Sequence, residues 1–181
     1  VESTYDWRLC DWARDTGART VVHANCEFYR HGMHKLPHPD GWWLPTTWRS
    51  EHMPEGTRHV PVPVALDRFP HRHEWRTAPP HEPRFLHAAG RVSVYDRAGT
   101  ETFTRACPLA GALDATITTL EPLPAELQPA GPWVDVEVRS VQNYWEGYSG
   151  YDVLVLPRRY GGLSLPTQEA MAAGLAVVMP D

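Results

Sequence analysis

The spacing of apolar and polar residues predicts a helix near the start of the chain. Ser3 and Asp6 have the spacing of a capping box, and apolar residues follow at intervals of three and four. These apolar positions are Tyr5, Leu9, Trp12 and Ala13. We expect a helix from about residue 4 to 15, ended by Gly17.

Two runs rich in β-forming residues follow, ARTVVHANCEF and GWWLPTTWRS, and they predict short strands. The second run ends at Thr46 or Thr47, either of which predicts the N-cap of a helix. Residues 59–83 then carry six prolines, and their alternation of Pro and Val favours an extended backbone. We interpret this segment as a linker between two domains.

The second half of the chain alternates strands with helices. Residues 100–112 predict a helix, NYWEGYSG predicts a short helical turn, and a short helix is expected between Ser164 and Gly174. The expected strands are RFLHAAGR, DATITTL, WVDVEVR, DVLVLP and LAVVMP. Strands with so few polar residues are typical of a parallel sheet covered on both faces, so the predicted fold class is α/β.

Composition narrows the kind of protein. The 181 residues have a formal net charge of −5, which argues against holding nucleic acid through bulk positive charge. The three widely spaced cysteines fit neither a disulfide framework nor a structural zinc site. No apolar run is long enough to span a bilayer and no signal peptide is visible, so we expect a cytoplasmic protein without a transmembrane segment. The start without Met and the end just after an apolar strand suggest a fragment.

RRYGGLSLPTQEAMAAGLAVV, residues 158–178, contains the strongest candidate site. In open α/β sheets, ligands bind beyond the carboxyl ends of strands, where loops enter helices. Gly161 and Gly162 allow the backbone to approach a ligand closely, and the helix start, with Ser164 as the expected cap, favours an anion such as phosphate. Glu169 is suited to accept hydrogen bonds from two sugar hydroxyls. It is equally explained as a carboxylate that complements the helix dipole.

DVLVLPRRYGGLSLPTQEAMAAGLAVV resembles the nucleotide-sugar-binding segment of retaining GT-B glycosyltransferases, the group often called family four. In that family an apolar strand enters a glycine-rich loop, followed by LP, by EAM, by a glycine and by a second apolar strand. The counterparts here are Leu165, Pro166, Glu169, Ala170, Met171, Gly174, Val177, Val178 and Asp181. The resemblance implies the Rossmann-like parallel sheets of a GT-B glycosyltransferase, with both domains incomplete, and a contact from Glu169 to the nucleotide ribose.

One position departs from the family pattern. The family usually has a second glutamate eight positions before the first, where it contacts the donor sugar, and here that position is Gly161. Backbone N–H groups of Gly161, Gly162 and Leu163 are then the expected contacts to sugar or phosphate. Arg158 adds a cation to the same loop.

Arg91 and Arg97, in AAGRVSVYDRAGTETF, resemble the paired basic residues with which this family neutralises the donor diphosphate. The resemblance gives them a catalytic role, because cations placed there stabilise the charge on the departing nucleoside diphosphate without a metal ion. The alternative explanation is two solvated loop arginines.

The resemblance also implies a domain assignment and a reaction. Residues 1–66 would end an N-terminal acceptor-side domain, residues 59–83 would be the linker, and residues 84–181 would form a truncated C-terminal nucleotide-sugar-binding domain. The implied enzyme transfers a sugar, such as a hexose, from a nucleoside diphosphate sugar to an unknown acceptor hydroxyl with retention, and needs no cofactor. We expect the fragment itself to be inactive. The alternative is a nucleotide-sugar-binding module without activity, suggested by Gly161.

Other residues are weaker candidates for a catalytic, metal-binding or sugar-binding role. In the family a histidine often lies near the donor sugar. His23 is either that residue or a buried, hydrogen-bonded core residue. Asn25, Cys26 or Glu27 could occupy the position near the sugar instead, and of these Glu27 is the catalytic candidate. The histidines of the following loop could converge on a metal only from a helix, which the nearby glycine and prolines disfavour, so we predict no metal site. These histidines are His31, His34 and His38. The tryptophans near the second strand, Trp42, Trp43 and Trp48, are expected in the core.

Overall fold

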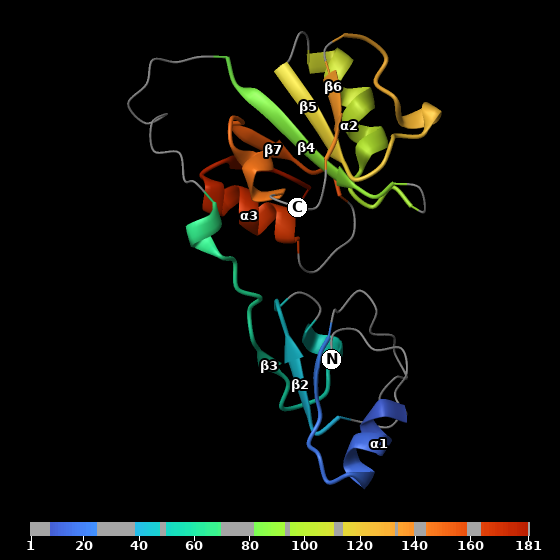
Figure 1. The fold of residues 1–181 in the computed structure, drawn as a ribbon, viewed down its shortest axis with the longest axis vertical. Coiled ribbons are helices and arrows are strands. Elements are labelled where there is room, and N and C mark those ends of the chain that lie inside the picture. Colours follow the sequence, from blue (N-terminus) through green and yellow to red (C-terminus); the bar gives the residue numbers. More distant parts are fainter. Residues whose placement is uncertain are drawn as a thin grey trace. The chain divides into compact units, whose positions relative to one another are not determined.

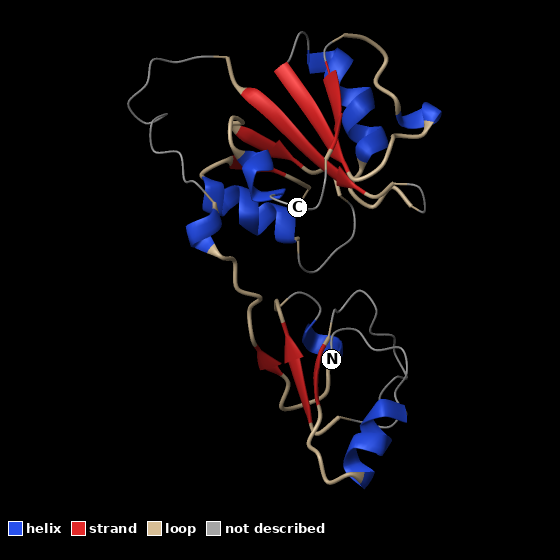
Figure 2. Cartoon of the chain, in the orientation of Figure 1, coloured by secondary structure: helices blue, strands red, loops and turns tan. Residues whose placement is uncertain are grey.

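The computed structural model describes residues 8–24, 39–47, 50–69, 82–92, 95–110, 114–132, 134–139, 144–158 and 164–180. The chain divides into two compact units, with the boundary between Pro63 and Val64 (Figure 1). Each unit has its own sheet, and every strand pairing is parallel (Figure 2). The predicted α/β class with parallel sheets is confirmed. The domain assignment stays a prediction.

Within the described residues, the first unit contains one α-helix and a three-stranded sheet in the order β1-β2-β3. The elements are α1 (Arg8–Asp15), β1 (Val21–His23), β2 (Gly41–Leu44), the 3-10 helix η2 (Ser50–His52) and β3 (Arg58–His59). Their buried core consists of Cys10, Val22, Ala24, Trp42 and Leu44. The first residues of the predicted helix 4–15 lie outside the described residues, and its C-terminal end is confirmed.

Three details of the first unit differ from the predictions. In α1 the buried side chain is that of Cys10, while Leu9 and Trp12 are 43% and 68% exposed, so the apolar spacing that indicates the helix does not mark its buried side. Adjacent residues of β2 point to opposite faces, which leaves Trp43 exposed although Trp42 is buried; Trp48 lies outside the described residues.

The helix predicted after Thr46 or Thr47 is also wrong, because only the 3-10 turn η2 forms there. Pro54 follows closely, and the residue before a proline disfavours helical dihedrals. The α-helix therefore has no room to extend.

The second unit is built on a five-stranded sheet in the order β6-β5-β4-β7-β8 (Figure 1). Its elements are η3 (Leu66–Arg68), β4 (Arg84–Gly90), α2 (Thr100–Ala106), η5 (Cys107–Ala110), β5 (Asp114–Thr119), η6 (Ala125–Leu127), β6 (Val134–Val138), η7 (Tyr144–Tyr148), β7 (Val153–Val155), α3 (Leu165–Ala173) and β8 (Ala176–Val178). All five predicted strands are confirmed. The predicted helix 100–112 is shorter than expected, because Pro108 cannot donate a helical hydrogen bond and the chain tightens into η5.

The two faces of β4 pack against different helices. Phe85 and Ala89 lie in the core that contains Phe103 of α2, whereas Leu86 and Ala88 lie in the core beneath η7 and α3. Helices thus cover both faces, as the apolar strands predict. The chain runs outward from β4 to β5 and β6 on one side, and from β7 to β8 on the other. The boundary between β4 and β7 is therefore a topological switch point, where such sheets bind ligands.

A buried histidine joins three of these elements. His87 of β4 is fully buried, and its ring stacks on Phe103 with centroids 4.6 Å apart. Its Nδ1 lies 2.8 Å from the carbonyl oxygen of Val155 in β7, and its Nε2 lies 3.0 Å from the hydroxyl of Thr100 in α2. Burial lowers the pKa of His87 to about 4, although the carbonyl of Val155 and the carboxylate of Asp96 act in the opposite direction.

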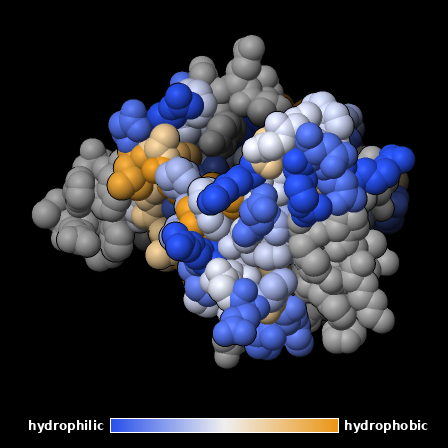
Figure 3. Space-filling model, turned by 90° about the horizontal axis from the view of Figure 1, so that it is seen from below, coloured by the Kyte–Doolittle hydropathy of each residue, from blue (hydrophilic) through white to orange (hydrophobic). Residues whose placement is uncertain are grey.

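Hydrophilic side chains dominate the described part of the surface drawn in Figure 3, and hydrophobic ones gather in a small area. None of the helices within the described ranges has both the length and the apolar character needed to cross a bilayer. The described cysteines, Cys10 and Cys107, are buried free thiols.

Candidate functional site

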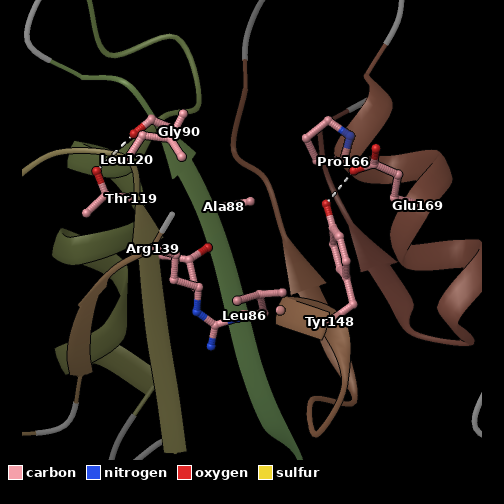
Figure 4. A pocket seen from close by; sticks show the side chains of 11 residues that line it. Leu86, Ala88, Gly90, Thr119, Leu120, Arg139, Tyr148, Pro166 and Glu169 are labelled. Atoms are coloured by element: carbon pink, nitrogen blue, oxygen red, sulfur yellow. Dashed lines mark hydrogen bonds between the residues drawn. The ribbon is translucent and has the colours of Figure 1, made fainter. Parts of the chain in front are cut away.

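A pocket of about 220 Å³ lies on the α3 side of the second sheet, at the carboxyl ends of β4 and β5 (Figure 4). Leu86 and Ala88 of β4 form its apolar floor. Arg139, which follows β6, lies on one side of this floor, and Tyr148 of η7 and Glu169 of α3 lie on the other. The pocket therefore has polar groups on opposite sides of an apolar surface.

Glu169 is the buried acid of this pocket, with 7% of its surface exposed. Its Oε2 accepts a hydrogen bond of 2.8 Å from the hydroxyl of Tyr148 (Figure 4). No described residue hydrogen-bonds Oε1, and this atom is not sealed from solvent, so it can accept a hydrogen bond from a ligand. Glu169 also lies beyond the first turn of α3, which disfavours the helix-dipole explanation.

The ends of α3 follow the sequence signals, except for the role of the Ser164 side chain. Pro166 lies in the first turn, and Gly174 ends the helix with a left-handed φ of 87°. Ser164 occupies the N-cap position, but its hydroxyl accepts a 2.8 Å hydrogen bond from the hydroxyl of Thr167. The prediction that its side chain caps the helix is therefore wrong.

Two loops meet at the switch point between β4 and β7. Gly99, which precedes α2, has a φ of +79°, and a Cβ at this position would approach the carbonyl of Pro157 well inside 3.0 Å. The loop after β4 therefore lies directly against the chain after β7. Arg97 is exposed like Arg91, but partial burial lowers its pKa, and the charge of Arg158 lowers it further. The structure thus brings Arg97 and Arg158 together.

The start of α2 is occupied by a carboxylate of the chain itself. Asp96 accepts hydrogen bonds from the backbone N–H groups of Thr100 and Glu101, each 2.8 Å long. These two amides are therefore satisfied within the chain and are not available to bind an anion. Arg91, directly after β4, is exposed.

Several predicted site residues lie outside the described residues: Glu27, Gly161, Gly162 and Leu163. The histidines proposed and rejected as metal ligands, His31, His34 and His38, lie outside them too. His23 is half-buried and hydrogen-bonds the carbonyl oxygen of Val60 at 3.2 Å. Within the described ranges, no group of three or more potential ligands could hold a metal ion.

The sequence reasoning missed four residues that shape the site: Asp96, Gly99, Arg139 and Tyr148. Asp96 and Gly99 had a partial signal, because an acidic residue and a glycine just before a helix are typical of its start. Arg139 and Tyr148 had none, since each reaches the pocket through contacts that are distant in the sequence.

Comparison with known proteins identifies the fold. No family model and no curated protein matches the sequence. Among solved structures, sucrose-phosphate synthase from Thermosynechococcus elongatus aligns with 93% of this chain and 52% of its own, at 15% identity and a TM-score of 0.67. A glycosyltransferase from Rickettsia africae aligns with 95% of this chain and 60% of its own, at 10% identity and a TM-score of 0.60.

TarM gives a third match, with 16% identity and a TM-score of 0.60 over 90% of this chain and 36% of that one. The chain has a glycosyltransferase-like fold. The predicted Rossmann-like parallel sheets of this fold are confirmed. The chain spans about half to three-fifths of the length of the first two structures.

Proposed function

We propose that this chain binds a nucleoside diphosphate sugar and belongs to a retaining glycosyltransferase of the GT-B type. The observation that carries the proposal is a single sheet edge that combines the pocket around the buried Glu169 with the arginine pair Arg97 and Arg158. The glycosyltransferase-like fold supports this class of reaction.

Each part of the site has a role suited to one part of the donor. Glu169 Oε1 accepts hydrogen bonds from the ribose hydroxyls, while Oε2 stays with Tyr148. Arg97 and Arg158 bind the diphosphate, since a guanidinium fork holds phosphate oxygens in pairs. Partial burial is the main cause of the lowered pKa of Arg97, and the charge of Arg158 adds to it. A diphosphate bound between the two guanidinium groups would offset their repulsion.

The same arginines supply the chemistry of transfer. Negative charge builds on the nucleoside diphosphate as it leaves, and cations fixed in advance stabilise that charge. We propose that this makes a metal or another cofactor unnecessary. Arg91 and the residues around Ser164, including Gly161, Gly162 and Leu163, complete the proposed donor contacts. Glu27, in the proposed acceptor-side domain, is the proposed catalytic residue of that domain.

Binding to the 181-residue chain tests the proposal directly. We expect UDP, GDP or ADP to bind in isothermal titration calorimetry, and we expect Arg97→Ala to weaken binding by about tenfold or more because a phosphate contact is lost. The thermal midpoint of the variant should stay near that of the parent. Arg105→Ala is the matched control: Arg105 is 79% exposed on α2 and pairs with Glu101, so binding should not change. Absence of binding for all three nucleotides would contradict the proposed function.

A binding module without transfer activity is the alternative, for which Gly161 in place of the family glutamate is the reason. The two functions separate on the whole protein. Release of nucleoside diphosphate from a panel of nucleotide sugars supports the transferase. Tight binding of the panel without any turnover supports the binding module.

A further inference from the structure

Arg139 is held firmly on one side of the pocket. Its Nε and Nη2 donate hydrogen bonds of 2.8 and 2.5 Å to Oε2 of Glu137, and Nη2 lies 3.3 Å from the hydroxyl of Tyr151. The guanidinium carbon also lies 6.0 Å from the centroid of the Tyr151 ring. Three hydrogen bonds and the ring contact therefore fix the orientation of a side chain that is still 29% exposed.

A glycine makes room for this guanidinium. A Cβ on Gly147 of η7 would meet Nη1 of Arg139 well inside 3.0 Å. Gly147 does not have a positive φ, so its backbone accepts an alanine, and the atom in the way is the end of a flexible side chain. Gly147 is therefore needed for the position of Arg139 and not for the local fold.

The pocket has an unused hydrogen-bond donor on one side and an unused acceptor on the other. Nη1 of Arg139 has no hydrogen-bond partner within the described part of the chain, so it remains a donor, while Oε1 of Glu169 remains an acceptor. Leu86 and Ala88 lie between them (Figure 4). A ligand that fills this space is flat and apolar in its middle, with acceptors at the Arg139 side and hydroxyl donors at the Glu169 side.

The charge at Arg139 also limits what it can bind. Glu137 already neutralises this guanidinium, which removes most of its attraction for phosphate. A guanidinium has only hydrogen-bond donors, so it can donate to a carbonyl oxygen but cannot bind an amino group, which is itself a donor. Uracil and guanine present a carbonyl at the edge that adenine and cytosine occupy with an amino group.

We propose that Arg139 selects the nucleobase and that the pocket takes a base with a ring carbonyl, uracil or guanine, in preference to adenine. This inference rests on the proposed function, because it assumes that Glu169 binds the ribose of the same nucleotide. Arg139 is then a specificity-determining residue, and Glu137, Tyr151 and Gly147 are its positioning residues.

Titration of the chain and its variants with UDP, GDP and ADP tests the proposal. The parent chain should bind UDP or GDP at least about tenfold more tightly than ADP. Arg139→Met removes the donors and keeps the apolar stem, so it should abolish this preference by weakening the carbonyl-base nucleotide and leaving ADP affinity unchanged. Gly147→Ala should do the same by displacing the guanidinium, with an unchanged thermal midpoint. Arg105→Met, on the surface of α2, should change nothing.

The outcomes separate this inference from the proposed function. Equal affinity of the parent chain for all three nucleotides, or an equal loss of all three affinities in Arg139→Met, would overturn the role of Arg139 and leave the nucleotide site standing. Binding of none of the three would remove the proposed function and the inference with it. A preference for UDP over GDP, or the reverse, would say which carbonyl base the pocket takes.

Discussion

At the scale of single residues, the site depends on how a buried carboxylate is held. Tyr148 donates to one oxygen of Glu169, and its ring packs edge-on against Phe69 with centroids 5.8 Å apart. One oxygen is thus fixed by the protein while the other faces the pocket. The EAM pattern made Glu169 recognisable in the sequence, but its partner lies 21 residues away, and no local pattern connects the two.

Tyr148→Phe should destabilise the chain by about 1–2 kcal/mol, because it leaves a buried charged oxygen without its donor. The ring packing against Phe69 is kept, so the loss reports on the hydrogen bond. Urea unfolding measures the difference. Tyr95→Phe serves as the control, since Tyr95 is 61% exposed and should tolerate the change. An unchanged free energy of unfolding for Tyr148→Phe would show that water replaces the hydroxyl without loss.

At the scale of elements, the sequence predicts what depends on local pattern. The apolar runs locate all five strands of the second sheet, because strands buried on both faces carry few polar residues, and Pro166 with Gly174 marks the ends of α3. The sequence does not predict which side chain of α1 is buried or that Asp96 closes the start of α2, because both depend on the path of neighbouring segments.

Gly99→Ala should destabilise the chain by about 2–4 kcal/mol, since alanine disfavours the left-handed φ and its Cβ would collide with the backbone of Pro157. Nucleotide binding should weaken as well, because the loops of Arg97 and Arg158 move apart. Gly147→Ala is the matched control for stability, since it meets only the flexible end of Arg139. Equal stability of the two variants in urea unfolding would show that the close approach of the loops is not required.

At the scale of the whole molecule, buried polar groups join elements that the hydrophobic pattern alone would leave independent. His87 links β4 to β7 and α2, and its environment favours the neutral ring. No sequence signal distinguished it from the other histidines, because its burial results from the packing of three distant segments. Such a group makes stability depend on pH.

The free energy of unfolding should fall by roughly 3 kcal/mol between pH 6.5 and pH 4 on account of His87. Its pKa is lowered from 6.5 to about 4 in the folded chain, so within this window the unfolded chain binds the extra proton. The stabilisation is complete above pH 6.5 and is lost as pH falls toward 4. Urea unfolding across this range measures the slope, and His87→Leu should flatten it. An equally steep slope in that variant would assign the effect to other groups.

Successive side chains of β4 point to opposite faces of the sheet, and this alternation decides which residues line the pocket and which face α2. Odd-numbered positions from Phe85 to Ala89 belong to the α2 side, and even-numbered positions from Leu86 to Gly90 line the pocket. Inserting or deleting one residue within the strand would exchange the two sets, placing an imidazole in the pocket and the pocket floor against α2. A residue can therefore be inserted or deleted after Gly90, in the loop, without exchanging the two faces. A single insertion or deletion within β4 would exchange them.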